Sequence, residues 1–595
     1  MMLLLLLVSL LLGIGGALKI DLQTPDGDNV RPLPHIWTST GFSPELRNTT
    51  NWTWPLDLTK DENHGLAIIG SLRYGALTHV RIHWLLDFVN ASEIPGDEKH
   101  VTFNFTTLDS TVAHLRRHNL RPAFELMGNP TGGTFISKIH RRRLRDLLLK
   151  MTARYQAAYG ANETRLWRWE TWNEPDLRQY WNQTVPAYFA YFRAVVDALR
   201  DAGLRVGGPA GIFRPRHRIC WEVLDEVAKT TNPQDVLSFL SFHHKGSESA
   251  DQVILGTRAV IKEIRARYPK LGNLSITNDE ADPLSGWWKP REWRADVRYA
   301  AMVVRTAGRL LDDVSFLSND NAFLPQAPHF FTQRTLLARF RESDNSTHFF
   351  LKPVAVSLAL LSLLGDKRIE STTSIDDDRL TIISGACWSD AEDFEGATII
   401  SFGDETKADF KESISVDLPL RCVGARCVDV RYTVFLLDNA RTNPWRVWRD
   451  AGSPSTPETA LRRRMRDAQG PYRAVASAPL TPRLSLTLRL PSVALVQVCS
   501  RRDALPRAPT NLETLQPAPG ETLLLWSDQD VGTRCLLGYE VQGRSGFDGD
   551  WRTLTHGSIL TQWHHAGSEQ EYRVRAVDLW GRNGTFSALL RPATY

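Results

Sequence analysis

The chain has 595 residues and is 42% hydrophobic, and its 71 Lys and Arg nearly balance its 67 Asp and Glu, with a formal net charge of +4. At about 100 to 200 residues per domain, this length predicts two to four domains with ordinary packed cores and excludes a small binding module. Near roughly pH 4.5 the 16 histidines would also be protonated, and the more positive surface would attract a polyanion. The basic runs at 140–145 and 462–466 could take part, although such runs are more often solvated helix faces.

The chain begins with an apolar run, residues 1–17, that ends in small residues before the polar chain starts. This pattern predicts a cleaved signal peptide rather than a signal anchor, because the run is short for a membrane span. No later stretch is long and apolar enough to cross a bilayer. N-x-Ser/Thr sequons support the same secretory route, and we take Asn104, Asn182 and Asn345 as glycosylation candidates.

Strand-like runs alternate with helical, charged segments through residues 33–370. The runs are centred near residues 38, 82, 124, 168, 206, 240, 277 and 317, and amphipathic stretches such as YFAYFRAVVDALRDAG separate them. Strand and helix alternating eight times is the signature of an α/β fold, the (β/α)8 TIM barrel, whose active site lies at the carboxyl ends of the strands. We therefore expect a catalytic barrel over 33–370.

After residue 370 the pattern becomes one of alternating antiparallel strands. Residues 371–500, together with 18–32, are predicted to form a β-sandwich, and the polar stretch RRDALPRAPT follows as a linker. Residues 501–595 are predicted to form a smaller β domain of the fibronectin type III or immunoglobulin-like kind. The six cysteines are too few for a disulfide-built scaffold, and they lack the spacing of a zinc site.

Two acidic residues directly follow predicted strands of the barrel. Glu174 lies in TWNEPD after strand four, with Asn173 before it, and Glu280 lies in ITNDEADP after strand seven. Two carboxylates at strand ends are what hydrolysis of a glycosidic bond requires, because one protonates the leaving oxygen and the other attacks the anomeric carbon. This chemistry needs neither a cofactor nor a metal ion, so none is expected.

Other charged residues near these strand ends have simpler explanations. Glu125, Glu170 and Asp279 are rival carboxylates to which we assign structural roles. Asp279 should point to the opposite strand face from Glu280, since side chains alternate along a strand. Arg81, on strand two, is expected to reach Glu280 and keep its pKa low.

Motifs in order along the chain resemble those of glycoside hydrolase family 39. They are STGF at 39–42, RIHWLL at 81–86, FELMG, ETWNEPD, HHKG, NDEADPL, SNDNAF and QRTL. The similarity continues through the predicted sandwich and the last domain, so it covers nearly the whole mature chain. It implies a retaining exo-glycosidase that removes terminal α-L-iduronic acid from dermatan sulfate and heparan sulfate by double displacement. It also implies a lysosomal glycoprotein, which a glycan-recognising receptor would sort.

The resemblance also assigns roles to single positions. It implies that Glu174 is the acid/base and Glu280 the nucleophile, and that Asn173 bonds the sugar hydroxyl next to the anomeric carbon. It implies a disulfide between Cys499 and Cys535. The further substrate contacts that it implies are Pro44, His83, Lys245, Gly286, Asp320 and Arg334.

The charges of these positions suit a uronic acid. Lys245 and Arg334 are cations that can hold its carboxylate, Arg334 by a bidentate fork. Two other functions stay open. Another family 39 glycosidase, such as a β-xylosidase, would not need these cations, and a non-catalytic glycan-binding barrel would not need Glu174 and Glu280. The expected partner is a sulfated glycosaminoglycan rather than a nucleic acid.

Overall fold

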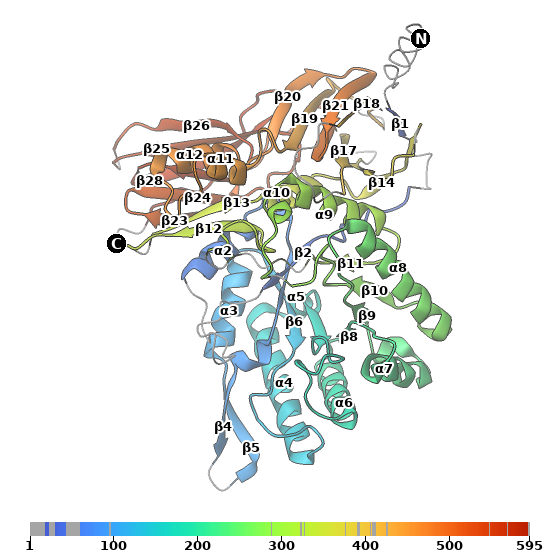
Figure 1. Cartoon of the computed structure of the whole chain (residues 1–595). Helices are drawn as coiled ribbons and strands as arrows, with labels where there is room; N and C mark the ends of the chain where they lie inside the picture. The colour runs from blue at the N-terminus through green and yellow to red at the C-terminus, as the bar shows by residue number, and fades with distance from the viewer. Residues whose placement is uncertain are drawn as a thin grey trace, which may run out of the picture.

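The computed structural model describes residues 18–22, 30–42, 60–94, 97–286, 288–319, 321, 324–325, 328–344, 346–374, 376–388, 393–404, 406, 412–423, 427–546, 548–567 and 569–592. They form an α/β body and, on one side of it, a layer of two β domains (Figure 1). The predicted signal peptide, 1–17, lies outside the described residues. In the described part of the chain, no helix has the length and apolar character needed to cross a membrane.

Eight parallel strands form the centre of the α/β body. They are β2 (Ser39–Phe42), β3 (His79–Ile82), β6 (Arg121–Leu126), β7 (Arg168–Thr171), β8 (Gly208–Gly211), β9 (Phe239–Phe242), β10 (Ser275–Asn278) and β11 (Phe316–Leu317). Parallel bridges from Ser39 to Ser318 and from Glu170 to Gly207 join the first four strands to the last four and close the barrel. Every predicted strand run is present, so the predicted (β/α)8 barrel is confirmed.

Helices cover the outside of the barrel. They are α2 (Lys60–Gly70), α3 (Thr106–Arg117), α4 (Lys138–Tyr159), α6 (Val185–Asp201), α7 (Arg218–Lys229), α8 (Ala250–Arg267), α9 (Val297–Arg309) and α10 (Pro353–Leu361). In α6, the Thr184 hydroxyl caps the first turn by accepting from the Ala187 N–H, and Tyr188, Phe192 and Val195 are buried on one face. Each such apolar side chain stabilises the fold by about 1.5 to 3 kcal/mol when fully buried, so the amphipathic pattern explains the outer ring.

Two β-hairpins extend from the barrel, and neither was among the predicted elements. β4 (Asn90–Ile94) and β5 (Asp97–Asn104) follow β3 and project away from the body, while β12 (Leu337–Arg341) and β13 (Thr347–Leu351) follow β11 and run beside the β domains (Figure 1). The buried guanidinium of Arg339 on β12 donates to Asp61 of α2 at 3.2 Å. This ion pair ties the second hairpin to the outside of the barrel.

The first β domain is a sandwich of two sheets. Its six-stranded sheet contains, in spatial order, β14 (Lys367–Ile369), β16 (Leu380–Cys387), β17 (Glu395–Phe402), β22 (Ser492–Cys499), β19 (Arg431–Asp438) and β20 (Tyr472–Pro479). The four-stranded sheet contains β15 (Ser371–Thr373), β1 (Leu18–Leu22), β18 (Ser413–Pro419) and β21 (Arg483–Arg489). β1 therefore belongs to the sandwich although it precedes the barrel in the chain. Two helices, α11 (Pro444–Asp450) and α12 (Thr459–Asp467), lie between β19 and β20 in sequence.

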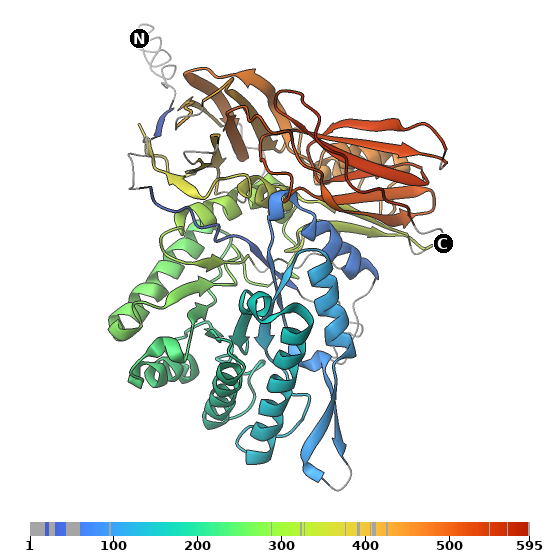
Figure 2. The ribbon, with the colours of Figure 1, turned by 180° about the vertical axis from the view of Figure 1, so that it is seen from behind.

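The last domain has two three-stranded sheets. One contains β23 (Thr510–Ala518), β24 (Glu521–Ser527) and β27 (Gln562–His565), and the other β26 (Arg552–Ser558), β25 (Leu536–Arg544) and β28 (Glu571–Asp578). Figure 2 shows this domain from behind, beside the sandwich and against the barrel. Buried Arg73, just after α2, forms an ion pair with Asp528 at 3.3 Å, and Asp528 also accepts from the Tyr539 hydroxyl at 2.6 Å. These contacts fix the last domain on the barrel.

Two disulfides close loops of very different length. Cys499, at the end of β22, bonds Cys535 in the last domain across a sequence separation of 36, and Cys422 bonds Cys427 across a separation of 5. Of the described cysteines, Cys220 and Cys387 are in neither bond.

Loss of the disulfide that closes the longer loop should lower the unfolding free energy more than loss of the other disulfide. A closed loop lowers the entropy of the unfolded chain, so we expect the variant in which Cys499 and Cys535 are both Ser to lose about 4 kcal/mol of unfolding free energy. The variant with Ser at Cys422 and Cys427 should lose about 2 kcal/mol. Denaturant unfolding of both variants measures the difference, and equal losses would contradict the loop-entropy explanation.

Candidate active site

Glu174 and Glu280 lie just past the carboxyl ends of β7 and β10, as predicted for strands four and seven. The backbone of Glu174 has a φ of +41°, which is uncommon for a residue other than glycine. Its N–H donates to the carbonyl of Ala210 at 2.8 Å, and the N–H of Trp172 donates to the hydroxyl of Tyr191 at 3.1 Å. These bonds hold a tight turn that keeps the Glu174 side chain buried.

The two carboxylates lie close together around one histidine and one lysine. An oxygen of Glu174, an oxygen of Glu280 and a ring nitrogen of His243 all lie within 4.8 Å of one another. His243 Nδ1 is 3.0 Å from Glu174 Oε1 and 3.4 Å from Glu280 Oε1. Lys245 Nζ is 3.2 Å from Glu174 Oε1 and also contacts Glu280 Oε2. Lys245 therefore bridges the two acids.

Arg81, on β3, contacts the cluster from inside the barrel. Its Nη1 is 3.0 Å from Glu280 Oε1 and 2.6 Å from Glu125 Oε1. Its Nε is 2.9 Å from Glu170 Oε2, and its Nη2 donates to Asn173 Oδ1 at 3.2 Å. The predicted contact of Arg81 with Glu280 is present, and the same guanidinium also orients Glu125, Glu170 and Asn173.

The surroundings keep Glu280 ionised. Burial by itself raises the pKa of Glu280, but His243, Lys245 and Arg81 outweigh burial and hold the pKa well below the ordinary value. For Glu174, burial and the Glu280 charge raise the pKa, but Lys245 and His243 together outweigh them and leave the pKa lowered. The two acids thus compete for the same cations, and Glu280 has more of them.

His243 carries much of this charge compensation. Burial lowers the pKa of His243, but Glu280, Asp279 and Glu174 outweigh it and raise the pKa to about 10. His243 is therefore an imidazolium at neutral and acidic pH. In the sequence, His243 lies in the HHKG motif after β9, and no feature of that motif distinguishes it from the next histidine.

Asp279 does not point away from this cluster, contrary to the expectation from strand alternation. β10 ends at Asn278, so alternation does not extend to Asp279, whose oxygens lie 3.3 Å from His243 Nε2 and 3.4 Å from Arg81 Nε.

Burial and the Asp279 charge raise the pKa of Glu170 to about 8. Glu170 is therefore protonated at acidic pH and is poorly suited to act as an ionised nucleophile.

The other predicted contacts fall into two groups among the described residues. His83 joins the acid cluster, because its Nδ1 is 2.9 Å from Glu125 Oε1. Gly286 and Arg334 belong to a neighbouring network around Asp282, which accepts from Arg294 at 2.8 Å. Arg294 donates to the Gly286 carbonyl at 3.1 Å, and the charge of Arg334 acts on Tyr299, whose hydroxyl contacts Asp282. Pro44, Asp320 and Asn345 lie outside the described residues.

The position of Arg334 depends on a lysine that sequence patterns did not identify. Lys352 is fully buried at the start of α10, and its Nζ donates to the Gln333 carbonyl at 2.9 Å and to the Thr335 hydroxyl at 3.3 Å. Both partners flank Arg334 in the chain. Lys352 thus fixes the turn that carries Arg334, which is itself 3% exposed.

Among the residues that the structure describes, two groups of side chains have the atom types and spacing of metal ligands. They are His83 with Glu125 and Glu280, and His243 with Glu174 and Glu280. A divalent ion there would lie beside Arg81, Lys245 and the imidazolium of His243, which already balance these carboxylates. The arrangement is better suited to proton transfer and nucleophilic attack by the carboxylates themselves.

A parallel barrel with two buried carboxylates at the ends of its fourth and seventh strands is the architecture of a glycoside hydrolase. The model of the glycosyl hydrolases family 39 matches residues 19–484, and that of the α-L-iduronidase C-terminal domain matches 510–593. The chain therefore belongs to glycosyl hydrolase family 39.

Individual relatives are similar over almost their whole length. α-L-iduronidase of Canis lupus familiaris is 36% identical over 94% of this chain and 91% of that protein. α-L-iduronidase of Homo sapiens is 35% identical over 93% of this chain and 91% of that protein. A solved structure of a bacterial orthologue of human α-L-iduronidase superposes with a TM-score of 0.82 over 97% of this chain and 99% of that chain, at 25% identity.

Proposed function

We propose that the protein is a retaining exo-glycosidase that hydrolyses terminal α-L-iduronic acid linkages in dermatan sulfate and heparan sulfate. The observation that carries the proposal is the buried pair of Glu174 and Glu280, with oxygens within 4.8 Å and the cationic Lys245 on both. The similarity to α-L-iduronidases along nearly the whole chain supports the choice of substrate.

Double displacement at this pair runs in two steps. Glu174 donates its proton to the leaving oxygen while Glu280 attacks the anomeric carbon, which forms a glycosyl ester and releases the shortened chain. Glu174, now ionised, takes a proton from water, whose oxygen displaces Glu280 and restores the original anomeric configuration. The spacing favours this route, because inverting enzymes keep their carboxyl groups about 6.5 to 9.5 Å apart to admit a water molecule.

Asn173 and His83 complete the proposed sugar site. Arg81 donates to the Asn173 oxygen, which turns the amide NH2 outward as a donor for a sugar hydroxyl. A bond of this kind to the hydroxyl next to the anomeric carbon strengthens in the transition state. His83 lies beside Glu280 with its Nδ1 bonded to Glu125, which directs the other ring nitrogen away from Glu125.

A uronic acid explains the placement of Lys245. Its carboxylate is on C5, which only the ring oxygen separates from the anomeric carbon, so a cation beside Glu174 and Glu280 is within reach of it. Arg334, on the neighbouring network, is buried and supplies a second cation for the proposed carboxylate site. A β-xylosidase would bind a sugar without that carboxylate, and the two cations, Lys245 and Arg334, favour the uronidase over this alternative.

We also propose that the protein reaches the lysosome through the secretory pathway. The signal-peptide pattern of residues 1–17 and the sequons support this route. Asn104 and Asn182 are exposed in the structure, so both side chains are accessible to glycosylation. Glycans at such sites would allow recognition by a sorting receptor.

The substrate proposal predicts a charge-specific loss of activity. Arg334→Ala should lower kcat/KM for an aryl iduronide by about 10- to 100-fold, since charge-assisted bonds contribute about 1.5 to 3 kcal/mol. It should change hydrolysis of the uncharged aryl idoside much less. Lys245→Ala should show the same preference, but its idoside activity should fall too, because Lys245 also contacts both catalytic acids.

Lys270→Ala is the matched control, because Lys270 is an exposed lysine before the amino end of β10. It should leave both substrates unaffected. If Arg334→Ala slows the iduronide and the idoside equally, Arg334 does not recognise the carboxylate. If the wild-type protein cleaves neither sugar but cleaves an aryl xyloside, the proposed substrate is wrong.

A further inference from the structure

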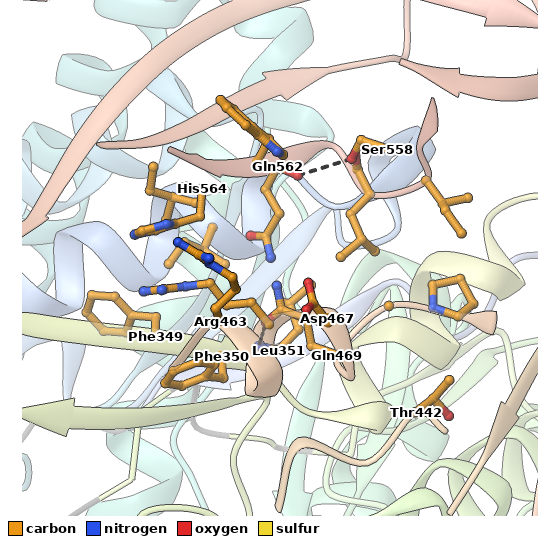
Figure 3. Close-up of a pocket in the computed structure, with 18 of the residues that line it drawn as sticks. Phe349, Phe350, Leu351, Thr442, Arg463, Asp467, Gln469, Ser558, Gln562 and His564 are labelled. Atoms are coloured by element: carbon orange, nitrogen blue, oxygen red, sulfur yellow. Dashed lines mark hydrogen bonds between the residues drawn. The ribbon is translucent and has the colours of Figure 1, made fainter. Parts of the chain in front are cut away.

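A cavity of about 690 Å³ lies where the barrel, the sandwich and the last domain meet. Figure 3 shows its walls, with Phe349 and Phe350 from β13, Arg463 and Asp467 from α12, and Gln562 and His564 from β27. None of the described residues that line the cavity belongs to the acid cluster around Glu174 and Glu280. Its volume is in the range of small-ligand sites, which hold about 300 to 1,000 Å³.

The charged lining of the cavity is strongly positive. Four arginines line it, namely Arg441, Arg463, Arg466 and Arg473, while Asp467 is the one carboxylate among the described lining residues. Burial lowers the pKa of Arg466 and of Arg473 to about 10, so both stay charged at neutral and acidic pH.

The arginines keep much of their hydrogen-bonding capacity for a ligand. Arg441 stacks over the ring of Tyr472 at 4.2 Å, and Arg463 is exposed on α12, and neither forms an ion pair with a described carboxylate. Arg466 is 3.7 Å from Glu521. Glu521 is already in contact with Arg462 at 2.7 Å and with His564 at 2.9 Å. One shared carboxylate therefore balances only part of this charge.

The basic run at 462–466 is accordingly more than a solvated helix face. Arg462 and Met465 are buried, and Arg462 also contacts Glu342 at 3.0 Å, which anchors α12 to the segment between β12 and β13. This anchoring directs Arg463 and Arg466 into the cavity wall, whereas Arg464 is exposed and is not part of the wall. The local pattern of the run cannot distinguish these positions.

The remaining lining suits a saccharide. The side chain of Gln562 offers an amide, and Trp563 offers an aromatic face. The Ser558 hydroxyl donates to the Leu560 carbonyl at 3.0 Å, so its oxygen is left as an acceptor. Arginine forks match the geometry of sulfate and carboxylate groups, as they match that of phosphate. Cations, a neutral amide and an aromatic face in one cavity suit an anionic saccharide.

We propose that this cavity is an accessory binding site for a sulfated oligosaccharide, separate from the site of hydrolysis. The positive lining selects an anionic ligand, and the choice of a sulfated saccharide rests on the proposed function. An exo-acting enzyme releases a shortened chain after each cleavage. A second site on the same molecule would keep long chains bound near the enzyme between cleavages and would leave short substrates unaffected.

The test uses a ligand that the proposed site of hydrolysis cannot cleave. A sulfated tetrasaccharide with a 4,5-unsaturated uronate at its non-reducing end carries no terminal iduronic acid to be cleaved. Calorimetric titration should give a dissociation constant that rises at least tenfold in the variant Arg441→Ala/Arg463→Ala. The chemically desulfated tetrasaccharide should bind at least tenfold more weakly than the sulfated one to the wild-type protein.

Arg464→Ala is the matched control, because it removes the same charge from the same helix outside the cavity wall. It should change the dissociation constant less than twofold. An equal effect of Arg464→Ala would overturn the proposal in favour of diffuse surface attraction, and equal binding of the desulfated ligand would overturn the role of sulfate.

Hydrogen exchange gives a second readout that does not need a variant to fold. The tetrasaccharide should slow exchange at 459–473 and 558–566 in the wild-type protein, and protection elsewhere without protection there would overturn the site. Cleavage of a small aryl iduronide by all variants should stay within twofold of wild type. If even the wild type fails to cleave it, the proposed function fails, whatever the result of the binding measurements.

Discussion

Glu280→Gln is expected to abolish turnover while the protein stays folded and still binds its substrate. The amide keeps the size of the side chain but cannot attack the anomeric carbon, and the loss should be roughly four orders of magnitude in kcat or more, as for other catalytic nucleophiles. Binding persists because Lys245 and Arg334, which we assign to the uronate, are unchanged. Single-turnover kinetics with an aryl iduronide, together with a binding measurement, checks both parts.

The product of a rescue reaction identifies the role of Glu280 more sharply. In Glu280→Ala, added azide can occupy the space of the missing carboxylate and attack the anomeric carbon directly, so a single displacement gives a glycosyl azide of inverted configuration. The wild-type enzyme should give iduronic acid of retained configuration, because two displacements occur. An inverted first product from the wild type, seen by NMR, would contradict the assignment of Glu280 as nucleophile.

Glu174→Ala is expected to slow substrates in proportion to their need for protonation. General acid catalysis contributes about 10²- to 10⁴-fold, so a natural disaccharide with a poor leaving group should lose activity in that range. An aryl iduronide with an acidic phenol should lose much less in its first step. Azide should rescue the second step and give a glycosyl azide of retained configuration, opposite to that from Glu280→Ala. Equal losses on both substrates would exclude Glu174 as the acid.

The same acid should appear in the pH profiles of the wild-type enzyme. In the free protein, burial raises the pKa of Glu174, but Lys245 and His243 together outweigh it and lower the pKa. When the substrate carboxylate pairs with Lys245, this lowering weakens and the pKa of Glu174 rises. Since the proposed mechanism requires protonated Glu174, the basic limb of kcat should lie at higher pH than that of kcat/KM. Coincident limbs for the iduronide would contradict the pairing of Lys245 with the substrate.

The order of the strands and the two catalytic candidates could be predicted because both depend on local signals. Hydrophobic runs separated by amphipathic helices determine the barrel, and the polar residues after the fourth and seventh runs must then lie at the same end of it. Glu174 and Glu280 were identified in this way. The hairpin β12–β13 was not, because short strands outside the repeating pattern lack such a signal.

The tertiary structure decides which charged side chains contact one another in the site. Asp279 follows the last residue of β10, so its direction depends on the contacts with Arg81 and His243 rather than on strand alternation. Lys245 was expected to hold a substrate carboxylate and is found on both acids. Burial sets the strength of each of these interactions, and burial depends on which strands become neighbours.

The sequence by itself determined the fold class, the family and the positions of the two acids. Each of these follows from the periodic pattern of hydrophobic residues or from a contiguous motif. The tertiary structure alone decided that His243 stands between those acids, that Lys352 holds the turn of Arg334, and that Arg441, Arg463, Arg466 and Arg473 line one cavity. The cavity, for example, combines these arginines with residues near 68, 350 and 560, which are far apart in the chain. Their meeting depends on the closure of the barrel and on the docking of three domains, which no local pattern records.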